Sequence, residues 1–211
     1  MNLNGMTINF LGDSITEGYG IEEPEKVFHQ IICEKHQMKC ARNYGVSGTR
    51  IARQHVSSLW NTKWDLFFEL RAEVMDKNAQ AVVVFGGTND FGHGDAHFGT
   101  TDSEDIDTFC GALNSLINKL ERDFPDAKII FMTPLHRPDE TQPSEPDGKN
   151  LEDYANAIRE ICAKRHIDVI DLFKINPLDP TNEELVPDGV HPSVLGHSIM
   201  AQVIGDALLA L

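Results

Sequence analysis

The sequence predicts an α/β fold in which helices cover both faces of a five-stranded parallel sheet, giving three layers. Short apolar runs alternate with longer amphipathic stretches along the 211 residues, as in repeated βαβ units. Two of these runs, 81–85 and 129–132, are apolar at every position, which is typical of parallel strands buried on both faces. Polar motifs follow several of the runs, and a parallel sheet brings such motifs to one edge.

Each element can be placed along the chain from its pattern. The expected strands are 7–11, 39–43, 81–85, 128–133 and 168–171. The expected helices are 27–36, 64–77, 106–124, 151–165 and 193–211. Two long connections, 86–103 and 134–150, are rich in Gly and Pro, and loops of more than about 12 residues are commonly functional. These elements predict one domain over 1–211, an α/β/α sandwich of flavodoxin type.

The composition excludes several classes of partner. Eighteen basic and 33 acidic residues give a net charge of −15, which disfavours both nucleic acid and anionic membranes as partners. No apolar run approaches the ~20 residues that cross a bilayer, and the N-terminus lacks the pattern of a signal peptide. The four cysteines form no C-x-x-C pair, which favours reduced thiols and a cytoplasmic protein. A small molecule is therefore the expected partner, and the oligomeric state stays open.

Four polar motifs contain the candidate chemistry. They are 12–14, 43–48, 86–90 and 188–191, three after expected strands and one before the last helix. A serine hydroxyl needs an adjacent base to act as a nucleophile, and a histidine base needs a carboxylate to fix its tautomer. We therefore interpret Ser14 as the nucleophile, His191 as the base and Asp188 as the orienting carboxylate.

Together the four motifs resemble those of the SGNH hydrolases, the GDSL-type esterases and lipases. That family is named for a Ser, a Gly, an Asn and a His in four blocks, and their order and spacing match this chain from residue 12 to residue 192. Ile15 departs from the leucine in the family's name, which exchanges one apolar residue for another. The resemblance implies that Ser14 is the nucleophile, and that Gly45 and Asn89 are the named Gly and Asn.

The chemistry of acyl transfer also predicts an oxyanion hole. Negative charge develops on the carbonyl oxygen, and preorganised hydrogen-bond donors aimed at that oxygen are usually the largest catalytic contribution. The candidate donors are the backbone N–H groups of Ser14 and Gly45 and the side-chain amide of Asn89. We expect this reaction to need no cofactor.

Charged residues close to the motifs are candidates for substrate binding. They are Asp13, Arg50, Asp90 and Arg137. For the two arginines the alternative is pairing with acidic residues at the surface, which is the commoner role of a single arginine.

Two further groups of residues leave alternatives open. His93, Asp95 and His97 suggest a metal site, but no further ligand with suitable spacing supports it, so a solvated loop is the better interpretation and no metal is expected. Trp60 and Trp64 either pack in the core or form a pocket wall.

The favoured function is hydrolysis of carboxylic esters with short acyl groups, such as acetyl esters of carbohydrates or similar small esters. The two long loops contain few apolar residues, mainly Phe91, Phe98 and Leu135, so we expect acyl groups of about two to four carbons. A lysophospholipase or thioesterase with the same triad is one alternative. The others are metal-dependent phosphoryl transfer with Asp13 as nucleophile, and a binding module without turnover.

Overall fold

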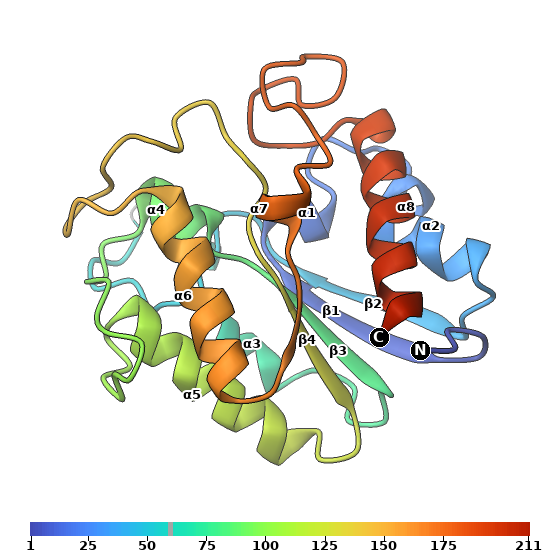
Figure 1. Cartoon of the computed structure of the whole chain (residues 1–211), viewed down its shortest axis with the longest axis horizontal. Coiled ribbons are helices and arrows are strands. Elements are labelled where there is room, and N and C mark those ends of the chain that lie inside the picture. Colours follow the sequence, from blue (N-terminus) through green and yellow to red (C-terminus); the bar gives the residue numbers. More distant parts are fainter. Residues whose placement is uncertain (59–60) are drawn as a thin grey trace.

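A parallel five-stranded sheet forms the centre of the fold, with helices on both faces (Figure 1). The computed structural model describes residues 1–58 and 61–211. The strand order is β2-β1-β3-β4-β5, which is the flavodoxin-like order. The strands are β1 (Thr7–Gly12), β2 (Cys40–Gly45), β3 (Ala81–Phe85), β4 (Lys128–Met132) and β5 (Asp168–Ile170). The predicted sandwich is therefore confirmed, and each expected strand is found with shifts of one or two residues at most.

The helices connect the strands and form the two outer layers. Those of the described residues are α1 (Ser14–Glu17), η1 (Pro24–Lys26), α2 (Phe28–Lys35), η2 (Thr62–Asp65), α3 (Phe68–Ala72), α4 (Thr88–His93), α5 (Phe109–Asp123), α6 (Leu151–Lys164), α7 (Leu172–Ile175) and α8 (Val194–Ala210). The three longest begin at polar caps, because the side chains of Thr108, Asn150 and Ser193 each accept a backbone N–H of the first turn.

The two faces of the sheet bury different sets of residues, because successive side chains of a strand point to opposite faces. In β3, Val83 belongs to the core that α2 and α8 cover, whereas Val82 and Val84 belong to the core that α3, α5 and α6 cover. Figure 1 shows α2 and α8 on one side of the sheet and α5 and α6 on the other. Burial on both faces explains why β3 is apolar at every position.

Two expectations about local structure are wrong. The predicted helix 64–77 is replaced by η2 and the short α3, because Phe67 is extended and the Phe68 N–H donates to the Arg50 carbonyl at 3.0 Å. The predicted loop 86–103 contains α4, which follows Gly87 in a left-handed conformation with φ of 105°. The other long connection, 134–150, contains no helix or strand.

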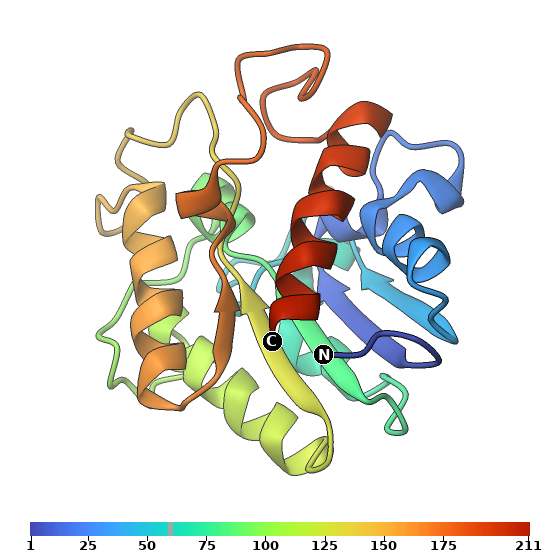
Figure 2. The ribbon, with the colours of Figure 1, turned by 45° about the vertical axis from the view of Figure 1, so that its right-hand side comes forward.

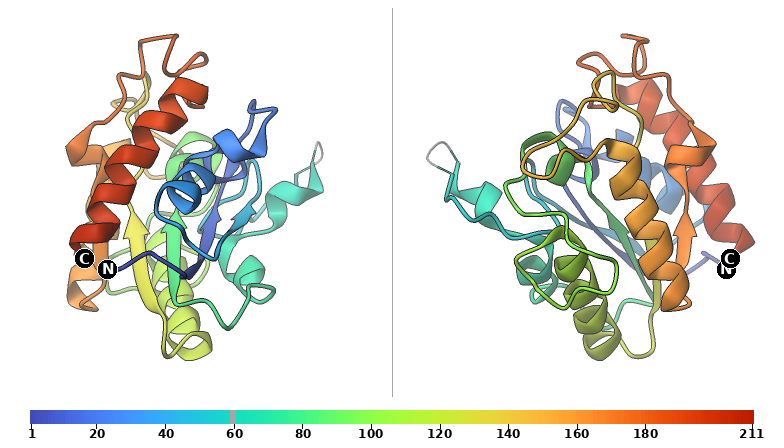
Figure 3. Two further views of the ribbon diagram at one scale, coloured as in Figure 1. Left: turned by 90° about the vertical axis from the view of Figure 1, so that its right-hand side faces the viewer. Right: turned by 60° about the vertical axis from the view of Figure 1, so that its left-hand side comes forward.

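The carboxyl ends of the strands form the edge at which ligands bind in folds of this kind. β1 pairs with β2 on one side and with β3 on the other, so the strand order reverses beside β1. Open α/β sheets bind ligands at such a reversal. The segment between α7 and α8 rises above this edge (Figure 2). The two termini meet at the opposite end of the molecule (Figure 3), where the Met1 amine donates to the Leu208 carbonyl at 3.0 Å.

None of the described helices combines the length and the apolar character that a membrane-spanning helix requires.

Candidate active site

Ser14 lies at the point where β1 passes into α1. Gly12 ends the strand, and the Asp13 side chain caps the helix by accepting the Ile15 N–H at 3.0 Å. Ser14 is the first residue of α1 and is only 4% exposed. The turn therefore holds the Ser14 hydroxyl at the carboxyl edge of the sheet, with little contact with solvent.

His191 and Asp188 approach Ser14 from the segment that precedes α8. His191 Nε2 lies 2.8 Å from Ser14 Oγ, and His191 Nδ1 lies 2.6 Å from Asp188 Oδ2. These two hydrogen bonds form a continuous series from the carboxylate to the hydroxyl. Ser14 and His191 are 177 positions apart in the sequence, so the parallel sheet brings them to one edge.

The Asp188 carboxylate organises the turn that contains His191. Asp188 Oδ1 accepts the backbone N–H groups of Val190 and His191 at 2.9 and 2.7 Å. Partial burial favours the neutral acid, but the hydrogen bonds from His191 and Val190 outweigh it and hold the pKa of Asp188 below its usual value. Asp188 is therefore an anion at neutral pH. It favours the His191 tautomer with a proton on Nδ1, which leaves Nε2 free to accept a proton from Ser14.

The geometry disagrees with the prediction that Gly45 donates to an oxyanion. The Gly45 N–H is already hydrogen-bonded to Asn43 Oδ1 at 2.8 Å. Glycine is required here because the end of β2 approaches α1 closely, and a Cβ at this position would lie 2.1 Å from the Glu17 nitrogen. Gly45 therefore serves the packing of the strand end, and its N–H closes a local turn.

Gly48, three residues after Gly45, is the better candidate for an oxyanion donor. In the described part of the chain, the Gly48 N–H makes no hydrogen bond. The neighbouring Thr49 carbonyl accepts one N–H of the Asn89 side chain at 2.9 Å, which holds the amide beside Gly48 and leaves its second N–H available. The segment 43–48 contains both glycines, and its sequence alone does not indicate which N–H is free.

Comparison with known families agrees with this arrangement. The model of the GDSL-like lipase/acylhydrolase family matches residues 10–199, which include all the motifs above. The chain belongs to this family. It is therefore a hydrolase of ester substrates, as the resemblance of the four motifs implies.

Solved structures support the same fold for this GDSL-like acylhydrolase over its whole length. One crystal structure is 28% identical and superimposes with a TM-score of 0.84, covering 100% of this chain and 99% of that chain. A possible lipase from Chitinophaga pinensis is 22% identical with a TM-score of 0.73, covering 97% and 98%. An acetyl xylan esterase is 24% identical with a TM-score of 0.66, covering 96% and 99%. No curated protein matches the chain.

Asp13 and Asp90 lie in the interior of this acylhydrolase rather than at its surface. They are 1% and 4% exposed, and Asp90 accepts the backbone N–H groups of Ile51 and Ala52 at 3.0 and 2.9 Å. Burial raises the pKa of Asp13 to about 7 and that of Asp90 to about 6. Both carboxylates accept backbone N–H groups beneath the carboxyl edge of the sheet. These positions do not fit the predicted contact with substrate.

The two arginines expected at the substrate are also engaged within the protein. Arg50 is 2% exposed, and it donates to His93 Nδ1 at 2.9 Å and to the Trp64 carbonyl at 3.1 Å. Arg137 donates to both carboxylate oxygens of Asp139 at 2.9 and 3.0 Å. These bonds make both arginines structural supports for the loops around the edge, and they leave no observation that favours substrate contact.

The metal interpretation of His93, Asp95 and His97 finds no support in their contacts. His93 faces Arg50, Asp95 accepts two backbone N–H groups at 2.9 and 2.8 Å, and His97 bonds to Asp147 at 2.8 Å. The three side chains therefore serve different segments. Within residues 1–58 and 61–211, no three His, Cys, Asp or Glu side chains gather as a metal site would require.

Trp64 forms a wall beside Gly48. A Cβ on Gly48 would lie 2.2 Å from the Trp64 indole nitrogen, and the Trp64 ring lies 5.2 Å from the His93 ring, centroid to centroid. Trp64 therefore packs against the segment next to the site. Trp60, for which the sequence left the same two roles open, lies outside the described residues.

Arg71 is a supporting residue that the sequence analysis missed. Its Nη2 donates to the Gly12 carbonyl and to Thr49 Oγ1, both at 2.9 Å, and its Nη1 donates to the Tyr44 carbonyl. Arg71 thus joins the ends of β1 and β2 to the segment beside Gly48. Burial lowers the pKa of Arg71 to about 10, so it stays a cation at neutral pH. Its position within a stretch expected to be an ordinary helix provides no signal for this role.

Proposed function

We propose that this family member is a serine esterase in which Ser14 is the nucleophile, His191 the general base and Asp188 the orienting carboxylate. The observation that carries the proposal is the hydrogen-bonded series from Asp188 Oδ2 through His191 to Ser14 Oγ, with distances of 2.6 and 2.8 Å. Proton transfer between a nucleophile and its base needs heavy-atom distances of about 2.6–3.2 Å, so this geometry suits acyl transfer.

The proposed acylation moves one proton along this series. Ser14 Oγ attacks the ester carbonyl carbon while its proton passes to His191 Nε2. The bond between that carbon and the alcohol oxygen then breaks, and the alcohol oxygen takes the proton from Nε2. Water next attacks the acyl group on Ser14 by the same proton path, which releases the acid and restores the hydroxyl. Asp188 remains ionised and stabilises the imidazolium that forms in both halves.

The oxyanion donors in this proposal are the N–H groups of Ser14 and Gly48 and the side-chain amide of Asn89. Gly48 takes the role predicted for Gly45, because the Gly45 N–H already donates to Asn43 and the Gly48 N–H has no partner within the described residues. The bond from Asn89 to the Thr49 carbonyl orients the amide before any substrate binds. Preorganised donors of this kind do not need to reorient when charge develops on the carbonyl oxygen.

The proposed acyl group is short, about two to four carbons, because the loops offer it little apolar lining. Phe91 and Leu135 are each 5% exposed and belong to the core. Phe98 packs edge-on against Tyr154, with ring centroids 5.1 Å apart. The apolar side chains that the two long loops contain are therefore used for packing.

A hollow of about 390 Å³ on the side of the segment 46–47 supports the same limit on acyl length. Its lining combines the polar side chains of Glu17, Ser47, Asn61 and Lys63 with the apolar side chains of Tyr19, Ile21 and Val46. A buried methylene is worth about 0.8 kcal/mol only when its surroundings are apolar, so a long acyl chain would gain less in this mixed lining than in a continuous apolar channel. This feature favours a short-chain esterase over the lysophospholipase alternative.

The rival function, metal-dependent phosphoryl transfer with Asp13 as nucleophile, receives no support from the position of that residue. Asp13 is 1% exposed, and its carboxylate accepts the Ile15 N–H. A nucleophile must reach its substrate, whereas this carboxylate lies beneath the turn that presents Ser14. The chain shares its fold with an acetyl xylan esterase, so this scaffold is compatible with hydrolysis of acetyl esters.

Labelling with a serine-reactive fluorophosphonate tests the proposal. We expect the wild-type protein to be labelled once, at Ser14, and to hydrolyse p-nitrophenyl acetate. Ser14→Ala should lose both properties while keeping its thermal unfolding midpoint, and Ser198→Ala, an exposed serine on α8, should keep both. Labelling of a folded Ser14→Ala protein, or its continued turnover, would assign the nucleophile to another residue.

A further inference from the structure

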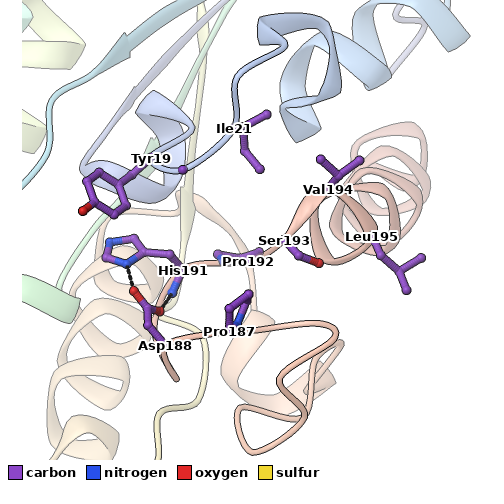
Figure 4. Close-up of a pocket in the computed structure, with 10 residues that line it drawn as sticks. Tyr19, Ile21, Pro187, Asp188, His191, Pro192, Ser193, Val194 and Leu195 are labelled. Carbon is purple, nitrogen blue, oxygen red and sulfur yellow. Dashed lines mark hydrogen bonds and ion pairs between the residues drawn. The ribbon is translucent and has the colours of Figure 1, made fainter.

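An apolar pocket of about 550 Å³ opens beside His191 (Figure 4). Segment 19–21, which follows α1, forms one wall, and segment 187–195, which runs through Asp188 and His191 into α8, forms the other. The apolar residues of its lining are Tyr19, Ile21, Pro187, Pro192, Val194 and Leu195. The volume lies within the range of about 300–1,000 Å³ that is usual for sites of small molecules.

Several apolar side chains of this pocket are exposed to solvent. Tyr19 is 57% exposed, Val194 44% and Leu195 52%. Figure 4 shows Ile21 and Val194 entering the pocket from opposite walls, with Tyr19 next to His191. Exposed apolar side chains that gather around a concave surface mark a binding site more often than scattered ones do. Val194 and Leu195 are the first residues of α8, so a helix of 17 residues fixes the position of one wall.

The position of the pocket determines which half of an ester can occupy it. In acylation the alcohol oxygen must take its proton from His191 Nε2, so the alcohol lies on the histidine side of the carbonyl carbon. The carbonyl oxygen lies on the side of Gly48 and Asn89. The pocket lining includes His191 and Asp188 but neither of these two donors. The pocket therefore adjoins the alcohol half of the substrate.

The charges around the pocket indicate which net charge the alcohol can bear. Among the ten lining residues there is no Lys or Arg, and Asp188 is the one acidic residue. The whole chain has a net charge of −15. An alcohol that bears a phosphate or carboxylate would meet no cation here and would be repelled by Asp188, so a neutral alcohol is favoured.

We propose that this pocket, defined by Tyr19, Ile21, Pro187, Val194 and Leu195 and called here the alcohol pocket, binds a neutral apolar alcohol group of the substrate, of alkyl or aryl type. The proposal rests on the serine esterase function argued above. It makes acetyl esters of apolar alcohols better substrates than acetylated carbohydrates, because a sugar hydroxyl in this pocket would lose water and find few polar partners.

Two series of esters separate the alcohol half from the acyl half. The alcohol series is ethyl, butyl and hexyl acetate, whose alcohols have nearly equal acidity. The acyl series is ethyl acetate, butyrate and hexanoate. For wild-type protein we expect kcat/KM to rise along the alcohol series, by up to about fourfold for each methylene that leaves water. An acetate of a polar ether of the same length as hexyl acetate should not share the gain.

Two variants test whether the alcohol pocket causes this rise along the alcohol series. They are Leu195→Ser and its control, Leu209→Ser. Both leucines are partly exposed on α8, at 52% and 45%, but Leu209 lies at the far end of the helix from the pocket. Leu195→Ser should lose roughly tenfold more kcat/KM with hexyl acetate than with ethyl acetate, and the acyl series should keep its wild-type trend. Leu209→Ser should follow the wild type in both series.

Three other results would each overturn the proposal. If Leu195→Ser changes the acyl series instead, the pocket holds the acyl chain. If the alcohol trend is absent in the wild type, or equal in Leu195→Ser and wild type, the pocket does not hold the alcohol. If the wild type hydrolyses no ester and Ser14 is not labelled by fluorophosphonate, the esterase function itself fails and the alcohol pocket fails with it.

Acyl transfer to added alcohols provides an independent test, because the incoming alcohol must occupy the place of the leaving one. With p-nitrophenyl acetate as donor, we expect butanol to compete with water for the acetyl group and to yield butyl acetate. Leu195→Ser should lower the ratio of butyl acetate to acetate several-fold, whereas Leu209→Ser should keep it. An unchanged ratio in Leu195→Ser would contradict binding of the alcohol at this site.

Discussion

The Tyr19 ring packs on the imidazole of His191, with ring centroids 4.6 Å apart and an angle of 42° between the planes. The Tyr19 N–H donates to the Ser14 carbonyl at 2.9 Å, so the residue that supports the base is tied to the residue that presents the hydroxyl. Tyr19 follows α1 directly through Gly18. One short turn of chain therefore determines where the nucleophile lies and limits how the imidazole of His191 can move.

Tyr19→Ala should lower kcat/KM, because the His191 ring loses an aromatic contact that is worth about 0.5–1.5 kcal/mol. That energy corresponds to a loss of roughly twofold to tenfold with ethyl acetate, whose alcohol occupies little of the alcohol pocket. Tyr19→Phe keeps the ring and should stay close to the wild type. Steady-state kinetics of both variants with ethyl acetate measures the difference. Equal losses in the two variants would mean that the phenol hydroxyl, and not ring packing, is responsible.

Asn89→Ala should lower kcat by roughly 10²–10³, the usual effect of removing one oxyanion donor. KM should change little, because the lost hydrogen bond is strongest in the transition state. Steady-state kinetics and the thermal unfolding midpoint, measured on the same sample, separate catalysis from folding. A higher KM with an unchanged kcat would show that Asn89 binds the ground state of the substrate, and its assignment to the oxyanion hole would then be wrong.

Gly48→Ala should impair both folding and catalysis. Gly48 has φ of +75°, and an added Cβ would lie 2.2 Å from the Trp64 indole nitrogen, so this segment must shift. Gly5→Ala is the matched control, because Gly5 has the same φ and no atom within 4 Å of the added Cβ. Both variants should lose about 1 kcal/mol of stability from the left-handed backbone, but only Gly48→Ala should also lose kcat. Equal kcat in the two variants would argue against Gly48 as a donor.

Asp188→Asn should lower kcat by about 10³–10⁴, because the neutral amide no longer favours the working tautomer of His191 or stabilises its imidazolium form. Asp179→Asn is the control. Asp179 lies in the same segment between α7 and α8, and hydrogen bonds from Thr181 hold its pKa below the usual value, but it does not contact His191. A kcat for Asp188→Asn within tenfold of the wild type would contradict the proposed role of this carboxylate.

The buried His197 should make one contribution to stability that depends on pH. His197 is 1% exposed and its Nδ1 accepts the Phe28 N–H at 3.3 Å, and burial, assisted by the charge of His29, lowers its pKa to about 4. An unfolded histidine titrates near ~6.5, so between about pH 6.5 and 4 His197 binds more protons in the unfolded chain, and its own contribution to stability falls as the pH falls.

His197→Asn should therefore lose less stability than the wild type between pH 7.5 and pH 5. Its absolute stability is expected to be lower at both values, because a packed ring is removed. His166→Asn, at an exposed position with φ of 54°, should follow the wild-type pH dependence. Urea unfolding midpoints at the two pH values measure the effect. A pH dependence in His197→Asn that equals that of the wild type would mean that His197 takes no part in it.

The amino-acid sequence by itself determined the sheet and the edge at which the chemistry lies. β3 and residues 129–132 of β4 are apolar runs of a length that suits strands buried on both faces, and polar turns follow the strands at their carboxyl ends. These are local properties, which depend on side-chain polarity and turn formation within a few residues. The same reasoning predicted Ser14, Asp188 and His191 as neighbours, and they are joined by hydrogen bonds in the structure.

Only the tertiary structure decided which groups at that edge remain available. The Gly45 N–H is used by Asn43 and the Gly48 N–H is not, a difference that two glycines in one short motif do not reveal. Asp13 is buried, and its carboxylate caps α1 by accepting the Ile15 N–H. The alcohol pocket likewise forms where segment 19–21 meets the start of α8, far away in the sequence. Burial and hydrogen-bond satisfaction depend on segments that the fold brings together, so no pattern within one segment can indicate them.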